Sequence, residues 1–428
     1  MAKRFRLKRK ETQMRLLILT QYFPPEIGAP QVRLLSMASE LKRLGHEVEV
    51  VTALPNYPRG RFFRGYEWCF YRCDTLGDVI VHRVWLHPAL GGGVQRMLNY
   101  GTFAITSLFG LSRAKKPDGI FIESPSLLLT IPGWIAASLW RVPIILNVAD
   151  LWPDSIVEMG FMKDGLLIRL LTALESWSYR KAAYINVMTE GQREVLLRKK
   201  GVPARKVLFL PNGVDTIQFS PRPIDAALKQ QLGLEGKKIF LWTGTQGHAH
   251  GLEHVLQAAK LLKNKPEIHF LFVGDGSERL NLERLRNNMG LQNVTFRDPV
   301  PPEELPPYFS ISESGLASLR GIPIFDGARP SKIFPILASG KPLIFIGRGE
   351  GARLVEKARA GVVVPPGDPT ALAEAVLQLA GNPELARELG VNGRLFVEEN
   401  HQWSKLVSAW MTQLSQLYAQ EAIPAREA

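Results

Sequence analysis

Length, composition and cysteine content limit what this chain can be. Its 428 residues are 46% hydrophobic and 22% charged, values that are ordinary for a globular protein, and the length favours two domains. The only two cysteines, Cys69 and Cys73, exclude a disulfide framework and a zinc site built from paired cysteines, so a reducing, cytosolic location is expected.

Segment 1–13 is strongly basic. Six positive charges and no acid lie in the first ten residues, which leaves a net charge of +7 for residues 11–428 out of the total of +13. No apolar core follows, so the segment is not a secretory signal, and we expect a disordered extension. Attraction to an anionic membrane surface is the alternative. Nucleic acid ranks lowest, because no binding module and no interleaving of basic and aromatic residues is present.

Strand and helix patterns alternate through the first half of the chain. An apolar strand at 15–20 leads into a loop rich in Pro and Gly, a helix at 31–44 and a strand at 48–52. Further strands are predicted at 119–122, 143–148, 183–188 and 206–210. The apolar segment 127–140 is too short for the ~18–20 residues of a membrane span and is broken by Pro132 and Gly133, so we expect a buried helix there.

A turn-rich segment at 211–215 interrupts this alternation, which then restarts. The second series contains a helix at 252–262 and strands at 239–242, 269–273, 294–297, 314–319, 343–346 and 361–364. We therefore expect a Rossmann-like domain at 14–213, a second at 214–400, and a helix at 401–428 that packs back on the first. The fold class is α/β, with two parallel-sheet domains facing a central cleft.

The segment 329–342 predicts a phosphate site. It brings Ser331 and Lys332 to the start of a helix that ends at Gly340, and a helix start carries unpaired N–H groups and positive potential. A lysine there completes a seat for phosphate. Pro335 is compatible with this helix, because an N–H in the first turn would be unpaired in any case.

Several motifs, taken in order and spacing, resemble the retaining glycosyltransferases of family 4, which have the GT-B fold. The resemblance extends from about residue 14 to 420, and it rests on segments 23–30, 45–52, 211–215 with Phe219, 251–253, 273–276, 330–332 and 364–368. Segments 54–60 and 150–155 are similar to transferases of bacterial O-antigen, capsule and exopolysaccharide assembly, the N-acetylfucosaminyl type above all.

The resemblance implies a retaining, metal-independent enzyme without a cofactor. It would transfer a hexosyl or N-acetylhexosaminyl group from a nucleotide-diphosphate sugar, with UDP as the expected nucleotide, to a lipid-linked or polysaccharide acceptor. The work would take place in the cytoplasm or peripherally on the inner face of the plasma membrane. No metal ligands are implied, and no dinucleotide fingerprint follows the first strand.

The implied catalytic residues are Lys332 and Asp150. The implied donor-binding residues are Gly28, Gly244, Thr245, Gly247, His248, Gly274, Asp275, Gly276, Val300, Pro330, Ser331 and Glu350. The family's usual Arg and Lys are absent from the loop at 243–251, which leaves Lys332 as the principal cation. Each assignment has a structural alternative, such as a solvated lysine, a turn glycine, a loop imidazole or a helix-capping carboxylate.

Two glutamates usual in the family are replaced here, by Gly327 and Pro335. The second normally binds the ribose, and losing one charged hydrogen bond costs about 1.5–3 kcal/mol, or roughly ten- to hundredfold in affinity. A weak or non-catalytic GT-B binding or assembly protein is therefore the alternative function. A nucleotide-sugar epimerase would need paired cleft carboxylates, which we do not identify.

The segment 90–116 is the candidate for the acceptor side. Its apolar residues lie between basic ends, which favours a membrane interface, whereas a core helix with solvated ends fits the same pattern. The apolar residues are Leu98, Tyr100, Phe103, Ile105, Leu108, Phe109 and Leu111, and the basic ones Arg96, Arg113, Lys115 and Lys116.

Overall fold

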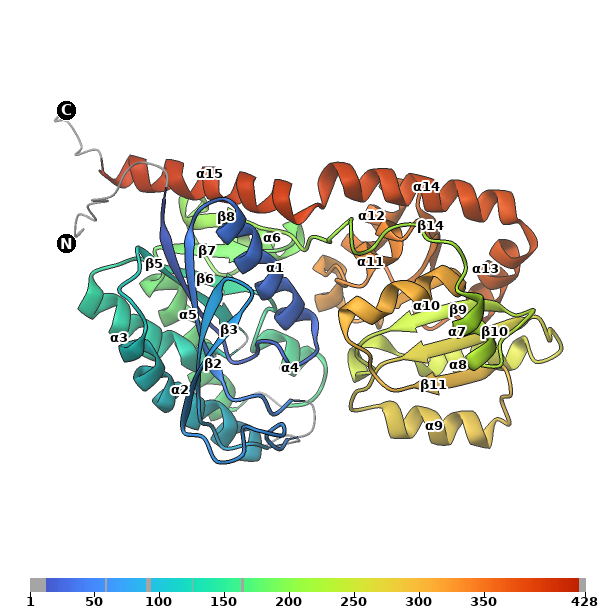
Figure 1. Ribbon diagram of the computed structural model, residues 1–428, viewed down its shortest axis with the longest axis horizontal. Coiled ribbons are helices and arrows are strands. Elements are labelled where there is room, and N and C mark those ends of the chain that lie inside the picture. The colour runs from blue at the N-terminus through green and yellow to red at the C-terminus, as the bar shows by residue number, and fades with distance from the viewer. Residues whose placement is uncertain (1–12, 58–59, 90–93, 125, 163–164, 423–428) are drawn as a thin grey trace. The chain divides into compact units, whose positions relative to one another are not determined.

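The computed structural model describes residues 13–57, 60–89, 94–124, 126–162 and 165–422, and the chain divides into two compact units (Figure 1). Unit 1 combines the chain up to Pro211 with the segment from Trp403 onward, and unit 2 spans Asn212–Gln402. All of the predicted basic segment except Gln13 lies outside the described residues.

Unit 1 is built on a sheet whose described strands run in the order β3-β4-β2-β1-β5-β6-β7-β8. Their bounds are β1 Arg15–Leu19, β2 Glu47–Ala53, β3 Tyr71–Leu76, β4 Val79–Val84, β5 Gly119–Ser124, β6 Ile144–Val148, β7 Tyr184–Val187 and β8 Val207–Phe209. All neighbours pair in parallel except β3, which runs antiparallel to β4. The sequence patterns did not predict the β3–β4 hairpin, because the edge strand β3 is largely polar and half-exposed.

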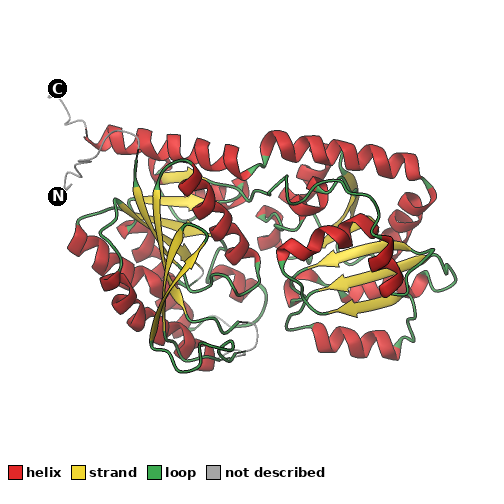
Figure 2. Cartoon of the chain, in the orientation of Figure 1, coloured by secondary structure: helices red, strands yellow, loops and turns green. Residues whose placement is uncertain are grey.

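Helices cover both faces of this sheet (Figure 2). They are α1 Ala29–Arg43, α2 Val94–Arg113, α3 Thr130–Trp140, α4 Asp154–Glu158, α5 Leu166–Lys181, α6 Glu190–Arg198 and α15 Trp403–Ala422. The helix expected at 127–140 is thus present as a short 3-10 turn followed by α3. Alternate strand residues separate the two faces, and one set shares a core with α1 and α15. On the other face α3 packs so closely that a Cβ at Gly133 would lie 2.3 Å from the Ile122 side chain.

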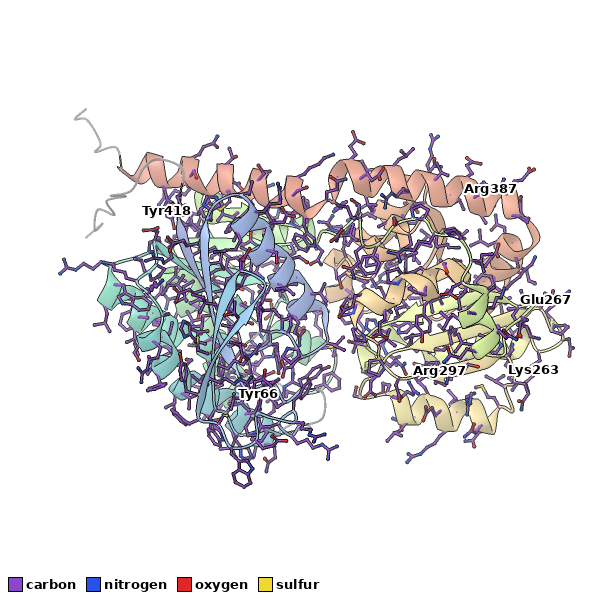
Figure 3. The ribbon with its side chains drawn as sticks, viewed as in Figure 1. Tyr66, Lys263, Glu267, Arg297, Arg387 and Tyr418 are labelled. Atoms are coloured by element: carbon purple, nitrogen blue, oxygen red, sulfur yellow. The ribbon has the colours of Figure 1, made fainter. Side chains whose placement is uncertain are left out.

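The helix α15 is an integral part of unit 1. Trp410 is buried, its ring packs edge-on against Phe121, and its Nε1 donates a hydrogen bond of 3.0 Å to Asn186 Oδ1 of β7. Further along, the ring of Tyr418 packs edge-on against Tyr184 (Figure 3). The apolar stripe predicted for this segment therefore lies in the core.

Unit 2 contains a sheet in which every described strand is parallel to its neighbours, in the order β11-β10-β9-β12-β13-β14. The strands are β9 Lys238–Thr243, β10 Ile268–Val273, β11 Val294–Arg297, β12 Ser312–Ser318, β13 Leu343–Ile346 and β14 Gly361–Val364. All six had been predicted to within two residues at each end. The turn-rich segment at 211–215 leads into this unit, and Val214 pairs there with Gln402.

Two hydrophobic cores separate the helices of unit 2 by sheet face. One core takes in α8 Glu253–Leu261, α9 Arg279–Asn288 and α13 Pro369–Gly381. The other takes in α10 Leu305–Ile311, α11 Ile333–Ala338, α12 Glu350–Ala358 and α14 Pro383–Asn400, with α7 Ala226–Gln231 at its margin. Through the described part of the chain, no helix is both long enough and apolar enough to cross a membrane.

Candidate functional site

The loops that follow β9 and β10 in unit 2 touch backbone to backbone. A Cβ at Gly274 would lie 2.1 Å from Gly244 O, and one at Gly276 would lie 2.4 Å from Gln246 O. Gly244 and Gly274 also have φ values of 92° and 149°, which side-chain-bearing residues rarely adopt. These glycines, predicted as donor-binding residues, therefore form a thin layer at the carboxyl edge of the sheet, where α/β proteins bind ligands.

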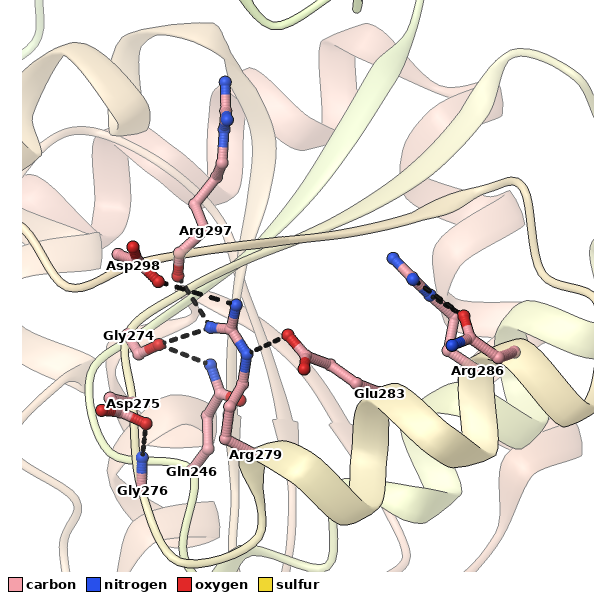
Figure 4. A network of polar contacts seen from close by, with 10 residues as sticks. Gln246, Gly274, Asp275, Gly276, Arg279, Glu283, Arg286, Arg297 and Asp298 are labelled. Carbon is pink, nitrogen blue, oxygen red and sulfur yellow. Dashed lines mark hydrogen bonds and ion pairs between the residues drawn. The ribbon is translucent and has the colours of Figure 1, made fainter.

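Arg279, the first residue of α9, ties these loops together (Figure 4). Its Nη1 donates to Gly274 O at 2.7 Å and to Arg297 O at 2.9 Å, so one guanidinium joins the ends of β10 and β11. Its Nε pairs with Glu283 Oε1 at 2.6 Å, one turn further along the helix. An arginine at a helix start opposes the helix dipole, and this misplaced charge is the signal by which sequence analysis could have found it.

Gln246 completes this network from the β9 loop. Its Nε2 donates to the same Gly274 O at 3.1 Å, and its own carbonyl accepts the N–H of Glu278 at 2.9 Å. Its Oε1 is buried and has no hydrogen-bond partner among the described residues. Oδ1 of Asp275, a predicted donor-binding residue, accepts a hydrogen bond of 2.8 Å from the N–H of Gly276. The loops are thus fixed by their own contacts before any ligand arrives.

Lys332 lies immediately before α11, as the sequence predicted, but its ammonium is buried. Nζ stands 3.1 Å from the centre of the Trp242 ring and has no hydrogen-bond partner within the described residues. Nε1 of Trp242 is likewise buried and unpartnered there. Burial holds the pKa of Lys332 well below its ordinary value. An unpaired buried ammonium is costly, so an anion at this position would relieve the cost.

The histidines of the β9 loop occupy a short 3-10 helix, His248–His250. His250 packs against Trp242, with ring centroids 5.0 Å apart, and its Nδ1 lies 2.8 Å from Ser318 O. Burial, with the nearby charge of Lys332, lowers the pKa of His250 to about 3, so its imidazole is neutral at neutral pH. The carbonyl of His248, the predicted ligand, accepts a hydrogen bond from Arg320.

The remaining predicted residues of unit 2 lie around this edge. Pro330 and Ser331 form the turn before α11, and their carbonyls accept the N–H groups of Ile333 and Phe334. Glu350 begins α12 and pairs with Arg329 at 3.0 Å. Thr245 is exposed and Gly247 half-buried in the β9 loop, and Val300 packs at the margin of the core. Pro335 is the third residue of α11, and Gly327 ends a 3-10 helix, Pro323–Gly327.

Two predicted residues, Gly28 and Asp150, belong to unit 1. Gly28 caps α1 in an extended conformation that any residue can adopt, so the backbone there does not demand glycine. Asp150 follows β6 and is exposed, with no hydrogen bond or ion pair of its carboxylate in the described part of the chain. The protein atoms around that carboxyl raise its pKa, and Arg33 opposes the shift.

Sequence analysis missed the buried charges beside Asp150. Arg33 of α1 pairs with Glu123 at the end of β5, and the second oxygen of Glu123 accepts a hydrogen bond of 2.7 Å from Asn147 of β6. Asn147 in turn accepts one of 2.6 Å from Asn186. The signal was available, because Glu123 and Asn147 interrupt otherwise apolar strands.

A second buried carboxylate, Glu26, lies in the loop between β1 and α1. Its Oε1 accepts the N–H groups of Asn56 at 2.7 Å and Tyr57 at 2.8 Å. Burial raises the pKa of Glu26 to about 7, although these hydrogen bonds and the charge of Arg83 oppose the shift. Across the described residues, no group of three or more His, Cys, Asp or Glu side chains is placed to hold a metal ion.

Comparison with known proteins gives matches over both units. Residues 28–213 match the glycosyl transferase 4-like domain, and residues 225–396 match the glycosyl transferases group 1 family. The putative colanic acid biosynthesis glycosyl transferase WcaI of Escherichia coli K12 is 30% identical over 338 residues, which cover 76% of this chain and 82% of that relative.

Solved structures give the same result for the fold. Sucrose-phosphate synthase from Thermosynechococcus elongatus superposes with a TM-score of 0.75 at 19% identity, over 95% of this chain and all of that one. HepE from Anabaena, solved in complex with UDP-glucose, superposes with a TM-score of 0.70 at 16% identity, over 94% of this chain and all of that one.

Proposed function

We propose that this chain, which belongs to glycosyltransferase family 4 and has the GT-B fold, transfers a sugar from a UDP-linked donor to a lipid-linked glycan in cell-surface glycan assembly. In this proposal unit 2 binds the donor and unit 1 binds the acceptor. Support for the donor comes from HepE, whose structure holds UDP-glucose, and support for the glycan from WcaI, which is named for colanic acid biosynthesis.

The observation that carries the proposal is the buried, unpartnered ammonium of Lys332 against Trp242. When the bond between sugar and diphosphate breaks, negative charge grows on the distal phosphate oxygen. A fixed cation that protein atoms shield from water stabilises such charge strongly. The Trp242 ring that Lys332 contacts lies near the end of β9, two residues before Gly244, whose loop backbone allows close approach of a diphosphate.

The proposed reaction retains the configuration of the sugar and needs no metal ion. The departing phosphate oxygen accepts the proton of the attacking acceptor hydroxyl on the same face of the sugar. The bond from the sugar carbon to phosphate oxygen breaks as the new glycosidic bond forms, and the nucleoside diphosphate leaves with the proton. Asp150 orients the acceptor, a role that suits a carboxylate without a protein partner among the described residues.

The helix α2 supports a lipid-linked acceptor because it carries two apolar faces. Tyr100, Phe103 and Leu111 are buried against the sheet, whereas a second stripe faces solvent. That stripe is formed by Val94 (74% exposed), Met97, Leu98, Ile105 (72% exposed) and Leu108. A solvent-facing apolar stripe ending in basic residues suits the surface of a membrane. We therefore propose that the enzyme works peripherally on the inner face of the plasma membrane.

Calorimetric titration with UDP and GDP tests the donor site. We expect UDP to bind and the Lys332→Met variant to bind it ten- to a hundredfold more weakly, the effect of one charged hydrogen bond of about 1.5–3 kcal/mol. Lys260→Met, which removes an exposed lysine of α8, is the matched control and should match wild type. Because a bound diphosphate opposes the depression of the Lys332 pKa, proton uptake on binding should increase as the assay pH is raised and should be absent in Lys332→Met.

A second candidate function follows from Pro335, which occupies the position where family members bind the ribose. A GT-B protein that binds nucleotide weakly and serves as an assembly partner would show UDP affinity without sugar transfer. If neither UDP nor GDP binds at millimolar concentration, the transferase proposal is refuted. Binding without turnover over a panel of UDP-sugars would favour the partner.

A further inference from the structure

A cluster of three tyrosines and one arginine lies at the carboxyl edge of the sheet in unit 1, around the start of α2. Tyr22 follows β1, Tyr57 follows β2, and Arg96 and Tyr100 belong to the first two turns of α2. The rings of Tyr22 and Tyr57 meet edge-on, 5.6 Å apart. Nε of Arg96 donates a hydrogen bond of 2.8 Å to the hydroxyl of Tyr100.

The guanidinium of Arg96 has no carboxylate partner. Among the described residues, the Tyr100 hydroxyl is its only hydrogen-bond partner and it enters no ion pair. Burial lowers the pKa of Arg96, but the hydroxyls of Tyr100, Tyr22 and Tyr57 outweigh this, so the group stays charged. An arginine has five N–H donors, and the donors of Arg96 that do not bond to Tyr100 can bind the oxygens of an anion.

Contacts with the loops that follow β1 and β4 hold the first turns of α2 in place. Gln21, beside Tyr22, donates to Asn99 Oδ1 at 2.5 Å, and Asn99 donates to the carbonyl of His87 at 2.8 Å. Arg96 is thus presented from a rigid element. Next to it, Val94, Met97 and Leu98 expose apolar side chains to solvent.

We propose that Arg96, with Tyr22, Tyr57 and Tyr100, binds the phosphate group of an amphiphilic acceptor, an isoprenoid-type diphosphate carrying the glycan. The guanidinium binds the phosphate oxygens in bidentate fashion, and the tyrosine hydroxyls donate to the same group. The neighbouring apolar side chains suit the lipid tail. The assignment of this ligand as the acceptor rests on the proposed function, whereas the anion site itself rests on the geometry of the cluster.

The test is a titration of the full-length protein, with and without saturating UDP, against three probes. Geranyl diphosphate carries both the phosphates and a lipid tail, inorganic pyrophosphate lacks the tail, and geranyl glucoside lacks the charge. Arg96→Met should lower the affinity for geranyl diphosphate at least tenfold and leave the affinity for geranyl glucoside unchanged. Arg198→Met removes the same charge from the exposed end of α6, away from the proposed sites, and should change each affinity less than twofold.

The outcomes separate the sources of the anion. If Arg96→Met loses affinity for geranyl diphosphate alone, the ligand is a lipid-linked phosphate. If it loses affinity for pyrophosphate to the same extent, the site is supported with a free phosphate as its ligand. The proposal would be overturned if wild type and Arg96→Met bound geranyl diphosphate equally, or if Arg198→Met lost as much affinity as Arg96→Met. UDP affinity is measured separately, so failure of the donor site does not decide the fate of the Arg96 site. Tyr100→Phe, which keeps the ring but frees the guanidinium, should lower the affinity for geranyl diphosphate by a smaller factor than Arg96→Met.

Discussion

Replacing Arg279 by methionine should loosen the loops that follow β10 and β11, where we propose that the donor binds, without unfolding unit 2. The change removes two hydrogen bonds from a charged donor, to Gly274 O and to Arg297 O. Each is worth about 1.5–3 kcal/mol in general. Both carbonyls keep a second donor, from Gln246 Nε2 and from the Gly274 N–H respectively, so the lower end of the range applies to each. We therefore expect a total loss of about 3 kcal/mol.

This loss should appear in ligand binding as well as in stability. A ligand that must order loosened loops binds more weakly by the ordering cost, and about 2 kcal/mol of such cost is roughly a thirtyfold rise in Kd. The assay pairs UDP calorimetry with urea unfolding of the same variant. Arg279→Lys, which can reach one carbonyl, should lose about half as much.

Arg286 provides the matched control for Arg279. It lies two turns further along α9 and stacks on the same Phe296 ring. Among the described residues, its guanidinium donates hydrogen bonds only to the side chain of Asn287. Arg286→Met should therefore change neither the UDP affinity nor the unfolding free energy by more than about 0.5 kcal/mol. If Arg279→Met loses stability but binds UDP as tightly as wild type, the guanidinium has only a structural role and the reasoning is refuted.

Two further predictions concern Glu26 and Pro335. Because the pKa of Glu26 is raised from 4.5 to about 7, the folded state holds a proton that the unfolded state releases. The contribution of Glu26 to stability should thus fall as pH rises from about 4.5 to 7, by up to roughly 3 kcal/mol. Glu26→Gln keeps the acceptor for Asn56 and Tyr57, and denaturation across this pH range should show a flatter profile; an unchanged slope would contradict the assignment. Pro335→Glu should tighten UDP about ten- to a hundredfold if the third residue of α11 points at the ribose, and calorimetry showing no gain would place that position elsewhere.

The strands of unit 2 were predictable because each is a short apolar run that lies between helices on both faces. Gly244 and Gly274 do adopt backbone conformations that other residues rarely take, whereas their role in donor binding stays a prediction. The β3 strand was not predictable, because an edge strand with one solvated face lacks the apolar run that marks its neighbours. Contacts between distant segments were also hidden, and the position of Lys332 beneath Trp242 depends on residues ninety apart in the chain.

The charged surroundings of Asp150 also could not be predicted from the sequence. Its place at the end of a strand was visible, but the charges around it come from α1 and from β5. A single sequence shows that Arg33 and Glu123 are charged. Only the fold shows that they are buried together, and this pairing leaves the Asp150 carboxylate, without an ion pair among the described residues, as the one that we propose for the acceptor.

The position of α15 has a consequence for how the protein is made. The core of unit 1 includes Trp403, Val407, Trp410 and Leu414, which are synthesised after all of unit 2. Unit 2 is complete in sequence before them, because it ends at Gln402. During synthesis unit 2 can therefore fold before unit 1, whose sheet keeps part of an apolar face uncovered until α15 has been made. A chain truncated before Trp403 would keep that face open and should depend on chaperones or aggregate.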